Sequence, residues 1–163
     1  MSEELRASGD LRQAMSRLAT GVTVVTATVD GHDHAMTANS FTSVSLDPPL
    51  VLLCVQQETG FHDALTRAGQ WGVSILREED RPTAAWLSTF GRPLQGQLDR
   101  VAHHRGETGV VLLDAALATL ECHTVQQHVA GDHVIVVAEV LRARHADRGQ
   151  PLVYYRSRYT STR

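Results

Sequence analysis

The chain of 163 residues is 42% hydrophobic and 20% charged, and its formal net charge is −3. This length suits one domain with a core large enough to need no disulfide or metal staple. All 15 basic residues are arginines, and they form no dense cluster. Because phosphate neutralisation needs clustered positive charge, nucleic acid is excluded as the main partner.

Nothing in the chain predicts contact with a membrane or export. No apolar run approaches the roughly 20 residues that span a bilayer. The start, Met1 to Glu4, is acidic where a signal peptide would be basic, and no apolar segment follows it. Cys54 and Cys122 stand alone, without a CxxC pair. We therefore expect a cytoplasmic protein with no membrane partner.

The first part of the chain changes from helical to extended periodicity. Helical spacing predicts an opening helix whose apolar face holds Leu11, Ala14, Met15 and Leu18. Ser8 or Asp10 would be its N-cap, and Gly21 would end it. Runs of β-branched and apolar residues then predict strands over residues 22–29, 35–46, 50–56 and 71–76, with turns at 30–31 and 47–49. The 50–56 strand is apolar enough to be buried on both faces.

The second part holds two short helices and three further strands. Helices are predicted over residues 61–68, where Gly69 ends the segment, and from an Asp80 cap to residue 88 or 89, with Pro82 in the first turn. Residues 90–109 show little pattern and are predicted as loop. Strands follow over 118–129 and 133–144, joined by a tight turn at 130–132, and a last strand covers 152–156.

This order of elements predicts one mainly β domain over residues 1–163. Strands and helices do not alternate as they would in βαβ units, and no GxGxxG motif opens a helix after a strand. A Rossmann nucleotide site is therefore not supported. The pattern favours a small antiparallel barrel with helices packed at its ends and rim.

One predicted strand is unusually polar. Residues 36–45 (MTANSFTSVS) carry six hydroxyl or amide side chains in ten positions. An exposed strand rich in threonine and serine for their β propensity would explain this. A strand that offers side-chain and backbone groups to a flat ligand rich in heteroatoms is the alternative, which composition alone favours less.

Five stretches in order resemble the short-chain flavin reductase family. They are LATGVTVVTA at 18–27, MTANSFTSVSLDPPLVLLCV at 36–55, LATLEC at 117–122, GDHVIVVAEV at 131–140 and PLVYYRSRY at 151–159. The resemblance covers about residues 10–159. It implies an FMN-binding split β-barrel, antiparallel and Greek-key-like, with a few flanking helices. It further implies a homodimer that reduces FMN or FAD with NADH or NADPH and passes reduced flavin to a partner monooxygenase.

The resemblance also implies which residues contact the flavin. Its isoalloxazine edge would lie along Met36, Thr37, Ala38, Asn39 and Ser40. The ribityl chain and phosphate would lie near Cys54, Val55, Thr59, Phe90 and Arg92, with Arg92 replacing the cation that the family places before the phenylalanine. Hydride arriving at flavin N5 builds negative charge toward N1 and the C2 carbonyl, so donors along that edge would stabilise it.

On the nicotinamide side the resemblance points to two groups of residues. His133 of the GDH motif matches a histidine that contacts the nucleotide, although a hairpin turn followed by a strand would explain that motif without any ligand. A binding role needs no titration, so we expect no general base there. The C-terminal group also fits an amphipathic last strand; it comprises Tyr154, Tyr155 and Arg156.

The remaining reactive side chains have simpler explanations. A thiol is not needed for hydride transfer, so Cys54 and Cys122 are predicted to pack as small side chains. The pairs His32–His34 and His103–His104 lack a third ligand at a recognisable spacing, so no metal is predicted. Two alternatives stay open: a flavin carrier or sensor without turnover, and a related flavoenzyme that keeps its flavin and reduces another acceptor.

Overall fold

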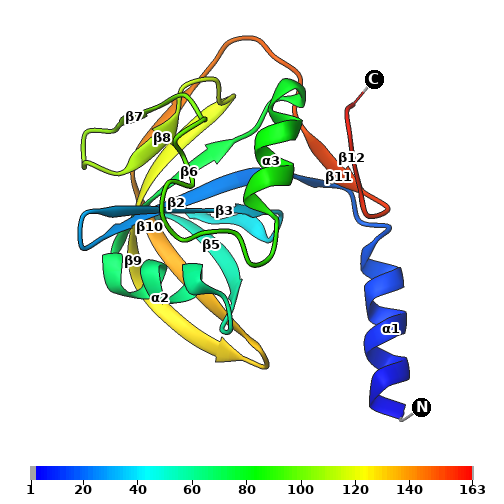
Figure 1. Ribbon diagram of the computed structural model, residues 1–163. Coiled ribbons are helices and arrows are strands. Elements are labelled where there is room, and N and C mark those ends of the chain that lie inside the picture. Colours follow the sequence, from blue (N-terminus) through cyan, green and yellow to red (C-terminus); the bar gives the residue numbers. More distant parts are fainter. Residues whose placement is uncertain (1–2, 163) are drawn as a thin grey trace.

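Seven antiparallel strands form the body of the protein, which a computed structural model describes over residues 3–162 (Figure 1). The sheet has the order β3-β2-β6-β9-β10-β5-β4. Its strands are β2 (Thr23–Val29), β3 (His32–Ala38), β4 (Phe41–Leu46), β5 (Pro49–Gln56), β6 (Gln70–Ile75), β9 (Ala118–Ala130) and β10 (His133–His145).

Smaller elements surround this sheet. The hairpin of β7 (His103–Arg105) and β8 (Val111–Leu113) lies on one side, and β11 (Val153–Tyr155) pairs with both β1 (Thr20–Gly21) and β12 (Arg158–Thr160). The helices are α1 (Glu3–Met15), α2 (Gly60–Ala68) and α3 (Arg81–Leu87), the last preceded by a 3-10 turn over Glu78–Asp80. No helix within residues 3–162 is long and apolar enough to cross a bilayer.

The two edges of the seven-stranded sheet meet. Only Asn39 and Ser40 separate the end of β3, at one edge, from the start of β4, at the other. Such a short connection forces the edges together, so the sheet curls into a barrel. Ser40 marks the junction, because its hydroxyl donates to the Cys54 carbonyl oxygen at 2.7 Å and its own carbonyl accepts from the Cys54 N–H at 3.3 Å.

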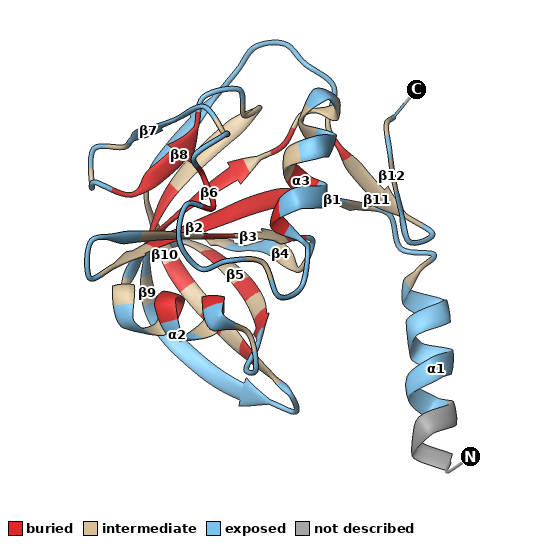
Figure 2. Cartoon of the chain, viewed as in Figure 1, coloured by how far each residue is buried: buried red, intermediate tan, exposed pale blue. Residues whose placement is uncertain are grey.

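The protein has two apolar cores, one on each face of β2. Val25 faces the barrel interior with Leu53, Trp71 and Val136, and α2 closes this core with Phe61 and Leu65. Val24 faces the other way, into a core that includes Leu76 directly after β6, Leu87 of α3 and Leu152 near the C-terminus. β2 is therefore buried on both faces, which accounts for its continuous β-branched sequence. Figure 2 shows this inner layer as a band of buried residues.

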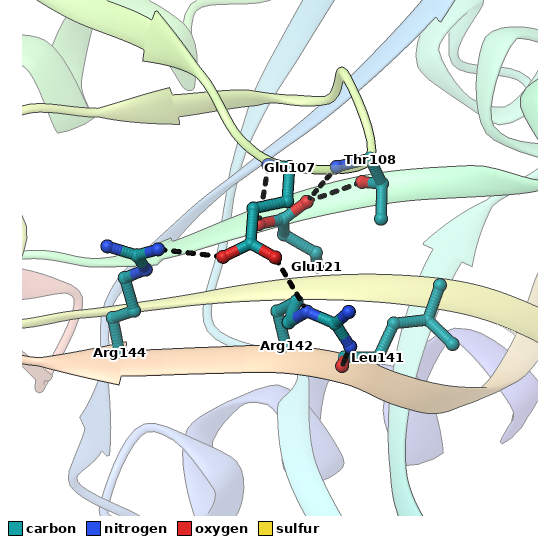
Figure 3. Close-up of polar contacts among 6 residues, drawn as sticks. All are labelled: Glu107, Thr108, Glu121, Leu141, Arg142 and Arg144. Carbon is teal, nitrogen blue, oxygen red and sulfur yellow. Dashed lines mark hydrogen bonds and ion pairs between the residues drawn. The ribbon is translucent and has the colours of Figure 1, made fainter.

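A polar latch fastens the loop between β7 and β8 to the sheet (Figure 3). The buried Glu121 carboxylate of β9 accepts hydrogen bonds from the Glu107 N–H, the Thr108 N–H and the Thr108 hydroxyl. Glu107 in turn pairs with Arg142 at 2.9 Å and with Arg144 at 2.8 Å, both on β10. Gly106 permits this close approach, since an added Cβ would lie 2.5 Å from the Glu121 carboxyl carbon.

The structure corrects several sequence predictions. The polar 35–46 strand is two strands, because the chain crosses from one sheet edge to the other at residues 39–40. The 90–109 loop contains β7, which is paired only by its neighbour β8. The last strand ends at Tyr155, since Arg156 and Ser157 turn with positive φ into the unpredicted β12.

Two predictions about burial are also wrong. β5 alternates: Val51, Leu53 and Val55 are buried, but the residues on its other face are only half-buried. The opening helix begins before its predicted caps, so Ser8 and Asp10 lie inside α1. Leu11 and Met15 of its apolar face are exposed, and α1 stands away from the barrel (Figure 2).

The other elements are confirmed, and one cap differs in detail. The predicted helix over 61–68 is α2, and Gly69 follows it as C-cap. Asp80 stands directly before α3, but its carboxylate accepts from the Arg77 N–H at 2.9 Å instead of capping the helix. The long strands around the 130–132 turn are β9 and β10.

Candidate functional site

A cleft of about 390 Å³ opens between β3, the start of α2 and the segment that follows α3. Three elements meet here because β3 is an edge strand with no neighbour on its outer side. The lining includes predicted flavin residues from each element, namely Met36, Thr37, Thr59, Phe90 and Arg92.

A second cleft of about 360 Å³ adjoins the first. Thr37 and Ser88 line both clefts, so the two form neighbouring halves of one groove along the outer edge of β3. Asn39 and Tyr154, predicted respectively for the flavin and the nicotinamide nucleotide, line only this second part. The groove therefore has room on both sides of Thr37.

The segment from Thr37 to Ser40 is held in place by its own polar groups. The Thr37 hydroxyl donates to the Ala84 carbonyl of α3 at 2.8 Å, and the Ala38 carbonyl accepts from the Thr23 hydroxyl at 2.9 Å. The Ala38 side chain lies in the core, whereas Asn39 is exposed between the two sheet edges. Of this segment, the Asn39 amide is thus the side chain most available to a ligand.

The start of α2 presents backbone donors to the first cleft. Thr59 is the N-cap: its hydroxyl accepts from the His62 N–H at 3.3 Å and donates to the Gln56 carbonyl at 2.8 Å. Gly60 and Phe61 follow and line the cleft. Their N–H groups have no acceptor within the helix, and the helix dipole is positive at this end, so the position suits an anion.

Arg92 brings a cation to the same cleft without a carboxylate partner. Its guanidinium donates to the Ala35 carbonyl and, at 3.0 Å, to the Thr89 carbonyl. Its Nε is buried and has no hydrogen-bond partner, and no ion pair joins Arg92 to an acidic group in the described part of the chain. Burial lowers the Arg92 pKa, but guanidinium remains protonated at neutral pH. A half-buried, uncompensated cation fits a ligand phosphate.

The other predicted flavin residues lie around this groove in different ways. Phe90 is 94% exposed at the cleft, with a ring that packs on no core. The Val55 side chain is buried inside the barrel, and Cys54 is half-buried on the outer face of β5; neither lines the groove. Glu58 lines the first cleft and adds a negative charge near its anion-binding features.

His133 lies beside the first cleft. It begins β10 opposite Gln56, which lines that cleft. The ring is held by its neighbour, because its Nδ1 is 2.7 Å from the Asp132 carboxylate, and this bond lowers the Asp132 pKa. The imidazole is half-exposed, so a ligand can reach it.

The three C-terminal residues do not act as one group. Tyr154 faces the second cleft and packs edge-on against Tyr159, with ring centroids 5.5 Å apart. Tyr155 points to the opposite face of β11, where Arg156 lies 5.3 Å from its ring centroid. Those two residues line a separate hollow of about 330 Å³ with Arg158.

His34 and Gln97 are among the groove residues that sequence inspection missed. His34 lines the first cleft, and burial lowers its imidazole pKa, assisted by the nearby His32. It lies two positions before Met36 and so on the same face of β3, a spacing that could have revealed it. Gln97 is buried in the cleft wall but comes from a stretch with no sequence pattern, which gave no signal.

Metal and thiol chemistry are not indicated among the groups that the structure describes. Within residues 3–162, no three His, Cys, Asp or Glu side chains come together to hold an ion. Burial raises the pKa of Cys122 to about 12, so this thiol stays protonated in the core. Both cysteines are free.

The antiparallel sheet curls into a split barrel with a two-part groove on its edge strand. Helix N–H groups and an unpaired arginine at this groove suit a phosphorylated ligand. The family model "Flavin reductase like domain" matches residues 15–163. The chain therefore belongs to the flavin reductase-like family, and the predicted family, fold class and enzyme class are confirmed.

Similar proteins agree with this assignment. The chain is 40% identical over 147 residues to "FMN reductase (NADH) SmoA" of Agrobacterium fabrum, covering 90% of this chain and 82% of that protein. It is 40% identical over 154 residues to an "NADH-dependent flavin reductase" of a Rhodococcus species, covering 93% and 84%. Among solved structures, BorF, the flavin reductase component of a bacterial two-component tryptophan halogenase, superposes with a TM-score of 0.89 at 44% identity, covering 94% and 97%.

Proposed function

We propose that the protein transfers a hydride from NADH or NADPH to FMN or FAD, and that the flavin enters and leaves the groove as a substrate. The observation that carries this proposal is the uncompensated Arg92 cation in a cleft beside the start of α2. An unpaired, half-buried charge costs stability unless a ligand of opposite charge uses it. A flavin phosphate has the required charge, and the family supplies the redox chemistry.

When bound, the flavin accepts the hydride at N5 and the nicotinamide supplies it from C4. The protein contributes position and electrostatics. In this proposal the phosphate lies between Arg92 and the N–H groups that follow Thr59, which itself fixes the first turn of α2. The ring lies along residues 36–40, where Asn39 offers an amide donor to the edge on which negative charge develops.

Several predicted flavin residues act through the backbone in this proposal. The Ser40 hydroxyl already donates to the Cys54 carbonyl, so Ser40 and Cys54 hold the crossing between sheet edges. Ala38 and Val55 place their side chains in the core and leave only main-chain groups for a ligand. Met36 and Phe90 line the cleft and supply apolar contact to the rings.

The nicotinamide nucleotide is proposed to contact His133 and Tyr154. Each lies at one part of the groove: His133 beside Gln56 of the first cleft and Tyr154 in the second. Tyr155 and Arg156 lie on the other face of β11, and we propose that they meet the nucleotide's phosphates there. One solved relative supports this: the NADH:FAD oxidoreductase SgcE6 of Streptomyces globisporus, in complex with NAD and FAD fragments, superposes with a TM-score of 0.89 at 35% identity.

A homodimer is part of the proposal. Leu11 and Met15 of α1 and Leu18, three residues beyond its end, are 63%, 53% and 56% exposed, where the chain stands away from the barrel. Apolar residues in a row on an unpacked helix need a partner surface, and a second copy of the chain is the occupant we propose. Light scattering at micromolar concentration tests this; a fully active monomer would contradict it.

The reduced flavin is proposed to go to a separate monooxygenase in the cytoplasm. Relatives include the reductase components of a 4-nitrophenol monooxygenase system of Rhodococcus opacus, 38% identical over 150 residues, and of a 4-hydroxyphenylacetate 3-monooxygenase of Thermus thermophilus, 36% identical over 148. The groove is open to solvent on the outside of an edge strand, which suits a flavin that must leave. Two free cysteines fit a reducing compartment.

The deciding experiment measures NADH and NADPH consumption by the purified protein with increasing FMN or FAD. Consumption that rises and saturates with added flavin is the expected result, and it ranks the two flavins and the two nucleotides. Flavin binding without consumption would instead indicate a carrier or sensor. Consumption that ignores added flavin would indicate a tightly held flavin and a different acceptor.

A further inference from the structure

Residue Ala35, on the free edge of β3, is held by two side chains from one segment. On its inner side β3 pairs with β2, where Ala35 stands opposite Thr26. On its outer side no strand follows. There the Ala35 N–H donates to Gln97 Oε1 at 2.9 Å, and its carbonyl accepts from the Arg92 guanidinium. The 89–97 segment thus satisfies this edge as a neighbouring strand would.

Three polar atoms of Gln97 help to hold that segment. Besides accepting from Ala35, its side chain donates through Nε2 to the Pro93 carbonyl at 2.8 Å. Its backbone carbonyl accepts from the Trp86 indole N–H of α3 at 3.0 Å. Only 5% of Gln97 is exposed, so water cannot replace these partners. One residue therefore ties the segment to β3, to itself and to α3.

The orientation of Arg92 depends on this arrangement. Its two hydrogen bonds go to carbonyl oxygens of Ala35 and Thr89, which direct the guanidinium but do not neutralise it. Its buried Nε has no partner. If the segment moves away from β3, the cation loses its bond to Ala35 and its fixed place in the cleft.

We propose that Gln97 is a positioning residue that gives the protein its preference for phosphorylated flavin, by holding the 89–97 segment so that Arg92 faces the cleft. The inference rests on the proposed function. Riboflavin carries the same ring and ribityl chain as FMN and lacks only the phosphate. A residue that acts through Arg92 therefore changes FMN binding and leaves riboflavin binding alone, whereas a general loosening of the cleft weakens both.

Equilibrium titrations with FMN and with riboflavin test this without turnover. The intact protein is expected to bind FMN at least about tenfold more tightly, as a charge-assisted phosphate contact implies. Gln97→Ala should raise the FMN dissociation constant about tenfold and the riboflavin constant less than twofold. The matched control is Gln95→Ala, an exposed glutamine in the same segment, which should change neither constant.

A double-mutant cycle links the effect to the cation. Arg92→Ala should remove the preference for FMN by itself, and adding Gln97→Ala should weaken FMN no further, because the two act as one unit. Additive losses would overturn the proposal. So would equal weakening of FMN and riboflavin in Gln97→Ala, or an intact protein that binds the two flavins equally.

A second variant protects the test if Gln97→Ala does not fold. Gln97→Glu keeps an oxygen for the Ala35 N–H but places a carboxylate beside Arg92. It should therefore also weaken the binding of FMN and leave the binding of riboflavin unchanged. Unchanged FMN binding in a folded Gln97→Glu would overturn the proposal. NADH consumption distinguishes failure of the proposed function from failure of the proposed role of Gln97. A protein that reduces both flavins but shows no selective FMN loss keeps its proposed function and refutes the role of Gln97.

Discussion

Two loops on the surface of the sheet differ in whether their charged side chains have partners of opposite charge or hydrogen-bond partners. In the latch between β7 and β8, Glu121 accepts three hydrogen bonds and Glu107 meets two arginines (Figure 3). In the 89–97 segment, Arg92 finds only carbonyls and keeps a buried nitrogen without a partner. A network whose charges are all paired stabilises its loop and needs no ligand. An unsatisfied charge in a cleft is the feature that we propose for ligand binding, so the comparison contrasts a structural charge with a candidate binding charge.

The largest expected effect, on the free energy of unfolding, comes from removing the central carboxylate of the latch. Glu121→Ala leaves the N–H groups of Glu107 and Thr108 without their acceptor and empties a buried site, at a cost of about 3 kcal/mol in unfolding free energy. Denaturant unfolding measures this loss. The flavin dissociation constant of the folded variant should stay within about twofold, since the latch does not line the groove. A large loss of flavin affinity would refute the separation.

Arg92→Ala should show the reverse pattern. Removing the cation costs about 1.5–3 kcal/mol of phosphate binding, or roughly 10- to 100-fold in the FMN dissociation constant. The free energy of unfolding should change little, because losing the two hydrogen bonds to carbonyls is offset by removing a half-buried charge without an ion pair. Arg144→Ala is the matched control: it removes an exposed latch arginine and should leave FMN binding unchanged.

Acid should weaken the latch selectively. Burial by itself raises the Glu121 pKa, but hydrogen bonds from Thr108 and Glu107 outweigh it and lower the pKa. A carboxylate with a lowered folded-state pKa stabilises the protein above its unfolded pKa of about 4.3 and loses that contribution as pH falls through the folded value. The stability difference between the native protein and Glu121→Gln should therefore shrink as pH falls from about 6 to about 3. A difference independent of pH would show that the charge is not what matters.

Asn39→Ala tests the ring end of the groove. The amide is exposed and supports no other element, so its loss should weaken flavin binding or slow reduction about two- to tenfold without changing the melting temperature. Flavin titration and steady-state kinetics measure this. Unaltered binding and rate would remove residue 39 from the site.

The smallest expected effect concerns the nucleotide. His133→Ala should raise the apparent KM for NADH a few-fold while the flavin constant stays unchanged, as loss of one neutral hydrogen bond implies. The rate should show no new pH dependence, because the ring binds and does not exchange protons. An unchanged KM for NADH would contradict the nucleotide assignment.

Local patterns were sufficient for most elements. The helical spacing before Gly69 and the β-branched run of β2 each encode their structure through neighbouring residues. The break at residues 39–40 and the end of the last strand at Tyr155 were missed, because each depends on a remote partner: a sheet edge for the first and β12 for the second. The candidate site shows the same contrast. The motif residue Thr37 and the predicted replacement cation Arg92 line the groove, whereas the side chain of the motif residue Val55 is buried in the core.

The sequence by itself determined the family and the mainly β fold, and it supplied the candidate flavin-binding residues, because ordered motifs and periodicity can be read along the chain. Only the tertiary structure decided which charges are satisfied. Arg92 lacks a carboxylate, and Gln97 reaches Ala35 from 62 positions away along the chain. Such pairings arise from the packing of an unpatterned segment against a sheet edge, and no local preference of the chain encodes them.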